Sequence, residues 1–114
     1  MTSTVSTRDR ALAALLAQKV QLEDHLLELR SACSSDLERA ALSHSYNSAA
    51  DQYEAALTKG LIVNDGEVLQ NVDDLKAIQQ QIQDAIDQAA AIGDLLNRIA
   101  SGIKIASKIV TLMA

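Results

Sequence analysis

Proline, phenylalanine and tryptophan are absent from the 114 residues, and the only aromatic side chains are those of Tyr46 and Tyr53. Strands favour β-branched and aromatic residues, whereas alanine, leucine, glutamine, glutamate, lysine and arginine favour helices. With no proline and 4 glycines, little in the chain interrupts a helix. The composition therefore predicts an all-α protein, and the length predicts a single domain.

Cysteine is almost absent as well, because Cys33 is the only one and cannot form an intramolecular disulfide. No stretch approaches the ~18 uncharged apolar residues of a membrane-spanning helix. The Ser/Thr-rich segment 1–10 lacks the apolar core of a signal peptide. Together these features lead us to expect a cytoplasmic protein.

Dense clusters of basic residues are also missing, and the formal net charge is −5. Proteins that bind nucleic acids contact phosphates through clustered lysine and arginine, so we expect no nucleic-acid partner. In the second half of the chain, acids dominate residues 61–97 and bases dominate residues 98–114. This order is typical of macrodipole complementation, with acids early in a helix and bases in its last turns.

Apolar residues in steps of three and four predict a first helix over residues 7–32, after a flexible leader over residues 1–6. This first seam consists of Leu12, Leu15, Leu22, Leu26, Leu29 and Cys33, and Lys19 is its only interruption. It loses its phase between Cys33 and Ala40, and a second seam replaces it. The members of the second seam are Leu42, Tyr46, Ala49, Tyr53 and Ala56.

The loss of phase coincides with serine residues that weaken a helix interior. Ser35 and Glu38 also have the spacing of a capping box. We therefore expect a kink or a short break within residues 31–36, followed by a helix over residues 36–59. One straight helix whose second half faces a different surface is the alternative.

The next boundary has several agreeing signals. Gly60 follows a lysine, as at many helix C-termini. Asn64 and Glu67 then have capping-box spacing, and Val63 and Val68 occupy the positions of a hydrophobic staple. A new helix is therefore expected to begin at residue 65.

From this point the apolar pattern keeps its phase to the end of the chain. One column recurs at every seventh residue: Val68, Leu75, Ile82, Ala89, Leu96, Ile103 and Val110. A second column lies three residues later: Ile78, Ala85, Ile92, Ile99, Ala106 and Met113. The pattern predicts one helix over residues 65–113, about 70 Å long at ~1.5 Å per residue.

Two such segments predict an antiparallel helical hairpin, with an interrupted first helix and one long C-terminal helix. The apolar stripe of the long helix is roughly 100° wide, which is too wide for one neighbour. We therefore expect a homo-oligomer, most simply a dimer, that completes a four-helix bundle. The expected interface residues are Leu96, Ile99, Ile103, Val110 and Met113.

No pattern in the sequence indicates catalysis, a cofactor or a metal site. The soft-metal ligands His25, Cys33 and His44 have neither the spacing of a helical metal pair nor that of a zinc motif. Cys33 lies on the first apolar seam, which indicates a buried small hydrophobe. The carboxylates of Asp73 and Asp84 fall opposite the apolar stripe, which is typical of a solvated face. We expect no enzymatic activity.

The functional hypothesis is a non-enzymatic interaction or assembly module that binds itself or a helical protein partner. The alternative is a membrane-active or secreted helical-hairpin protein that uses the amphipathic segment 92–114, which carries Arg98, Lys104 and Lys108. In size and two-helix layout the chain resembles the small secreted hairpins of the WXG100 class. Their Trp-x-Gly turn is replaced here by residues 59–61, Lys-Gly-Leu, so no functional residue carries over.

Overall fold

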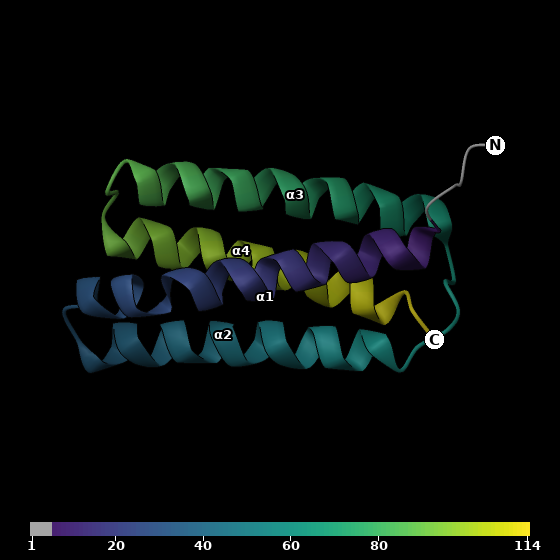
Figure 1. Cartoon of the computed structure of the whole chain (residues 1–114), viewed down its shortest axis with the longest axis horizontal. Helices are drawn as coiled ribbons and strands as arrows, with labels where there is room; N and C mark the ends of the chain where they lie inside the picture. The colour runs from purple at the N-terminus through teal and green to yellow at the C-terminus, as the bar shows by residue number, and fades with distance from the viewer. Residues whose placement is uncertain (1–5) are drawn as a thin grey trace.

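The computed structural model describes residues 6–114 and shows four helices packed side by side (Figure 1). The helices are α1 (Thr7–Ala32), α2 (Asp36–Leu57), α3 (Asp65–Asp87) and α4 (Ile92–Thr111). Together they form a bundle of 49 × 25 × 20 Å. The prediction of an all-α fold is confirmed.

The helix starts follow the capping residues of the sequence. Ser6 accepts a hydrogen bond from the Asp9 amide at 3.1 Å and caps α1. Ser35 and Asn64 cap α2 and α3 in the same way. The leader expected over residues 1–6 falls outside the described residues except for Ser6. The chain leaves the helical conformation between Ala32 and Asp36, where the sequence indicated a kink or break.

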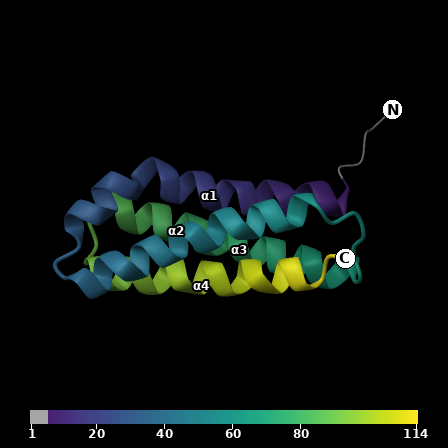
Figure 2. The same ribbon diagram turned by 90° about the horizontal axis from the view of Figure 1, so that it is seen from below.

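The four helices form two antiparallel hairpins, α1–α2 and α3–α4. The hairpins pack so that α1 lies against α3 and α2 lies against α4, whereas α2 and α3 are diagonally opposed (Figures 1 and 2). The α1–α2 and α3–α4 turns lie at one end of the bundle. The α2–α3 connection and the C-terminus lie at the other end.

The single helix expected over residues 65–113 is wrong. The chain turns back over residues 88–91, and Ala89 has a positive φ of 53°. The two-helix layout expected for the chain is therefore replaced by four helices within one copy. The resemblance to two-helix hairpin proteins loses its basis as well.

Burial explains why the long helix folds back. A left-handed alanine costs roughly 1–2 kcal/mol. The turn allows α4 and the residues after it to bury four large side chains in the same chain, each worth about 1.5–3 kcal/mol. These four are Leu95, Ile99, Ile109 and Met113. The free energy gained by burial exceeds the backbone strain at Ala89 several-fold. The seven-residue apolar pattern could not reveal the turn, because a turn that keeps the same side of both helices in the core leaves the pattern unbroken.

At the opposite end, the α2–α3 connection pairs with the last residues of the chain. The Val63 amide donates to the Leu112 carbonyl at 2.9 Å, and the Ala114 amide donates to the Leu61 carbonyl at 2.9 Å. Ile62 forms an antiparallel bridge with Met113 and packs against the core. These bonds fix the end of α4 to the start of α3.

The core consists of two apolar clusters separated by a polar layer. One cluster lies near the C-terminus and includes Leu15, Val72 and Ile109. The other lies near the α1–α2 and α3–α4 turns and includes Leu22 and Ile99. Gln18, Gln52 and Gly102 lie between them, and we call these three residues the polar layer.

The polar layer joins three helices by hydrogen bonds. The Gln18 amide donates to Gln52 Oε1 at 3.1 Å, and the Gln52 amide donates to the Ile103 carbonyl at 3.1 Å. Gln18 is buried, and its Oε1 has no hydrogen-bond partner in the described part of the chain. A Cβ at Gly102 would lie 3.3 Å from this oxygen, so glycine allows α4 to approach α1. Buried polar contacts of this kind favour one register of the helices.

Candidate protein-binding surface on α1

The side of α1 opposite the core carries a second aliphatic pattern. Leu15 and Leu22 point into the bundle, whereas a row at steps of three, four and seven residues points outward. We call this row the α1 outer face. Its members are Ala13, Leu16, Ala17, Val20 and Leu27.

Exposure of the larger members is substantial. Leu27 is 81% exposed, and Leu16 and Val20 are 38% and 39% exposed. The outward side of α4 carries small and basic residues instead, such as Lys104 and Ser107. Within residues 6–114, α1 is the helix with several large aliphatic side chains along its outward side. Exposed aliphatic residues that recur along one side of a helix are a candidate protein-binding surface.

A groove between α1 and α3 adjoins the α1 outer face and has a volume of about 490 Å³. It is lined by Ala17, Val20, Gln21, Asp24 and His25 of α1 and by Lys76, Gln79, Gln80 and Gln83 of α3. Ala17 is a small side chain on the α1 wall, and the α3 wall is polar. The groove therefore offers apolar contact at Ala17 and Val20 and hydrogen-bonding groups on both walls.

Two glutamines hold the walls of this groove together. The Gln21 side-chain amide donates to the Gln79 carbonyl at 2.9 Å. In return, the Gln79 side-chain amide donates to the Ala14 carbonyl at 2.9 Å. Because both acceptors are backbone atoms of the neighbouring helix, these bonds set the distance between α1 and α3. The groove is therefore preformed.

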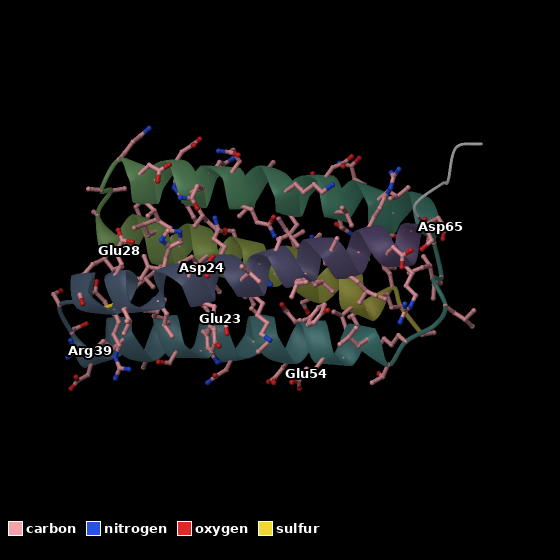
Figure 3. The ribbon with its side chains drawn as sticks, in the orientation of Figure 1. Glu23, Asp24, Glu28, Arg39, Glu54 and Asp65 are labelled. Carbon is pink, nitrogen blue, oxygen red and sulfur yellow. The ribbon has the colours of Figure 1, made fainter. Side chains whose placement is uncertain are left out.

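Carboxylates surround the α1 outer face. Glu23, Asp24 and Glu28 all extend from α1 (Figure 3). Glu28 lies 3.2 Å from His25 Nδ1, and Glu23 accepts a hydrogen bond from the Tyr46 hydroxyl at 3.4 Å. Lys76 stands on the α3 wall of the groove. Arg10 and Arg30 lie toward the two ends of α1, and Lys19 lies over the Tyr53 ring. The negative charge is therefore concentrated beside residues 20–28 of the row.

The residues expected to form an interface lie elsewhere. Ile99 and Met113 are buried in the two core clusters. Leu96, Ile103 and Val110 are partly buried and pack against the same clusters. The structure brings all five to the interior side of α4 or its end. The apolar stripe that was expected to be exposed is therefore covered within one chain. The need to cover it is no longer a reason to expect obligatory self-association.

Sequence reasoning missed the α1 outer face, although the signal was present. Leu16, Val20 and Leu27 are aliphatic residues that fall off the first apolar seam. A helix with one buried face does not need them for its core. Their spacing along the helix could have indicated a second contact surface.

The candidate metal ligands do not come together. Cys33 is buried and its thiol donates to the Leu29 carbonyl at 3.4 Å. His25 lines the α1 wall of the groove, and His44 is exposed on α2. Among residues 6–114, no group of three or more histidine, cysteine or acidic side chains is arranged to hold a metal ion.

A carboxyl group with a lowered pKa lies away from the groove, at the α1–α2 turn. Glu38 Oε1 accepts hydrogen bonds from the Ser34 amide at 2.7 Å and from the Ser34 hydroxyl at 2.8 Å. These bonds stabilise the carboxylate and hold the pKa of Glu38 below its usual value near 4.5. The Glu38 carboxylate thus caps the α1–α2 turn by accepting hydrogen bonds from Ser34.

Over the described residues, no helix combines the length and the apolar character needed to cross a membrane. No known family model, curated protein or solved structure matches this chain.

Proposed function

We propose that this protein is a non-enzymatic interaction module that binds one helix of a protein partner. The site is the α1 outer face together with the groove between α1 and α3. The observation that carries this proposal is the exposed aliphatic row on α1, with Leu27 81% exposed. Helix-in-groove recognition uses anchors spaced along one face of a helix, and the row supplies matching positions.

The charges around the row define the chemistry of the partner. Glu23, Asp24 and Glu28 lie beside Val20 and Leu27, so basic residues beside this part of the partner's apolar stripe would face opposite charges. The partner is therefore an amphipathic helix with an aliphatic stripe and lysine or arginine on its flanks. The same negative charge disfavours a nucleic-acid partner.

Leu27 is the best test of this surface. It is exposed and outside the core clusters, so its replacement by alanine leaves the bundle intact. Losing a leucine contact of roughly 1.5–3 kcal/mol at full burial would weaken binding by about tenfold or more. The measurement is fluorescence anisotropy with a labelled helical peptide of leucine heptads flanked by lysine.

Leu61 provides the matched control. It is 71% exposed but lies in the α2–α3 connection, at the opposite end of the bundle from Leu27. Leu61→Ala should leave peptide affinity unchanged. A second peptide with the same leucines and glutamate flanks should bind more weakly than the lysine peptide. The proposal fails if the lysine peptide does not bind, or if both alanine variants lose affinity equally.

The membrane-active alternative has less support. The segment 92–114 places its aliphatic residues inside the bundle, including Ile99 and Ile109. Contact with a lipid surface would require α4 to leave the bundle and expose them. A cytoplasmic setting stays part of our proposal, and the buried, unpaired thiol of Cys33 suits it.

Self-association is the second assembly mode that we propose, with a dimer as the simplest form. It does not use the α1 outer face. It depends on the turn between α3 and α4.

A further inference from the structure

The α3–α4 turn consists of residues that ordinarily continue a helix. Its sequence is Gln88-Ala89-Ala90-Ala91, with neither glycine nor proline. Alanine has the highest helix propensity of all residues, and glutamine is close to it. The local sequence therefore favours a continuous helix, and the turn exists because tertiary packing demands it.

The backbone of the turn confirms this conflict. The Ala90 amide donates to the Ala85 carbonyl at 2.9 Å, and the Ala89 amide donates to the Ile86 carbonyl at 3.0 Å. This pair of bonds is a Schellman motif, in which the left-handed position is usually glycine. Here that position is Ala89, with φ of 53°. The strain at Ala89 would be released if the segment became helical.

The start of α4 lacks the stabilisation that the other helices have. Ala91 is the N-cap residue and makes no side-chain capping hydrogen bond. The N-caps of α1, α2 and α3 each accept a backbone hydrogen bond through their side chains. The first amides of α4 would instead find carbonyl partners within a longer helix.

The apolar phase also survives the turn. Ile82, Ala89 and Leu96 follow one another at seven-residue steps, as do Ala85, Ile92 and Ile99. A helix running straight through residues 88–91 would keep the core residues of α3 and α4 on one face. The apolar face of α4 would then be exposed to solvent in its own copy. It would fit the space that α4 has left in the bundle of a second copy.

We propose that α4 exchanges between two copies of this chain, with α3 and α4 joined in one continuous helix. Each bundle of the dimer then contains α1, α2 and α3 of one copy and α4 of the other. Because the continued helix enters an oppositely oriented copy, α4 still runs antiparallel to the α3 that it packs against. Every core contact of the monomer is therefore regained.

The ends of the bundle suit this arrangement. Exchange joins two bundles at the end where the α1–α2 and α3–α4 turns lie (Figure 1). Leu37, near the start of α2 at this end, is 81% exposed. A hollow of about 190 Å³ also lies there, lined in part by Leu29, Ile86 and Leu95. A second bundle could cover both features.

The direct test measures the separation of α3 and α4 within one copy. Asp73→Cys and Ser107→Cys place spin labels on exposed positions, and Cys33→Ala removes the native thiol. The doubly labelled chain is refolded at high concentration with an excess of unlabelled chain, and the dimer is isolated. In the exchanged dimer the two labels lie about 50 Å apart along one helix. In the closed monomer they lie at a similar level on the two neighbouring antiparallel helices, so their separation is much shorter.

Two substitutions should shift the exchange, and one should not. Ala91 has φ of −58°, which proline adopts, so Ala91→Pro keeps the turn and breaks a continuous helix. It should abolish the dimer. Ala89→Gly relieves the turn and weakens the long helix, so the dimer fraction should fall at least tenfold. Ala77→Gly, the same change within α3, should leave the ratio of dimer to monomer within twofold.

Three results would overturn the proposal. These are a refolded protein without any dimer, a dimer whose labels keep the short separation, and a dimer that Ala91→Pro leaves intact. The residues changed in these experiments lie outside the α1 outer face. None of the three results would therefore bear on peptide binding at Leu27. The two proposals can therefore fail separately.

Discussion

The two turns at one end of the bundle both reverse the direction of the chain, but one is capped by polar side chains and the other is built from alanines. The α1–α2 turn is capped by Ser35, whose hydroxyl accepts from the Glu38 amide at 3.1 Å. In return, Glu38 Oε1 accepts a hydrogen bond from the Ser34 amide at 2.7 Å. The α3–α4 turn contains three consecutive alanines and holds Ala89 in a left-handed conformation. The first turn is thus specified locally, and the second is imposed by packing.

This difference shows that a helical hairpin can form without turn-forming or capping residues between its two helices. When both arms bury large aliphatic side chains, the burial can overcome roughly 1–2 kcal/mol of local strain. Such a turn is also the part of the fold that is easiest to reverse. The comparison can be tested by changing one residue at a time in each turn.

The largest expected effect is the loss of the cap at the α1–α2 turn. Ser35→Ala removes the hydroxyl that holds the Glu38 amide, so the free energy of unfolding should fall by about 1 kcal/mol. Urea denaturation followed by circular dichroism measures this value. Ser43→Ala, an exposed position inside α2, is the control and should be neutral or slightly stabilising. Equal destabilisation by both changes would mean that Ser35 does not specify the turn.

A smaller effect of opposite sign is expected at the α3–α4 turn. Ala89→Gly removes the left-handed strain, and part of this gain is offset by the greater freedom of glycine in the unfolded chain. The free energy of unfolding of the monomer should rise by about 0.5 kcal/mol. Ala77→Gly, inside α3, should lower it by about 1 kcal/mol. A destabilised Ala89→Gly variant would show that the turn is not strained.

The smallest effect is the pH dependence of the capped turn. The pKa of Glu38 is lowered in the folded protein by its bonds to Ser34. Its contribution is therefore complete above the unfolded pKa near 4.5 and is lost as the pH falls through the lower folded value. Because Glu38 is exposed to solvent, the change in stability should be small.

The measurement compares the unfolding midpoints of the parent and Glu38→Gln from neutral pH to about pH 3. The difference between them should shrink on acidification. Glu54→Gln, at an exposed position of α2 outside the turn, is the control. A difference that stays constant down to low pH would show that the carboxylate does not stabilise the turn.

Much of the fold could be predicted because its determinants are local. The capping residues Ser35 and Asn64 and the glycine at residue 60 indicate where helices begin and end, and the structure has helix boundaries near each. The turn at Ala89 could not be predicted in this way, because its residues favour a helix. The α1 outer face was within reach of the sequence, since Val20 and Leu27 lie off the first seam.

The amino-acid sequence by itself determined that the chain is helical, which sides of the helices are apolar, and that a capped boundary lies near Ser35. These properties depend on side chains within one or two turns of helix. Only the tertiary structure decided that residues 88–91 reverse the chain, that α4 covers its own stripe, and that α1 keeps an aliphatic row exposed. These outcomes depend on the total apolar surface buried when four helices meet, which no local segment records.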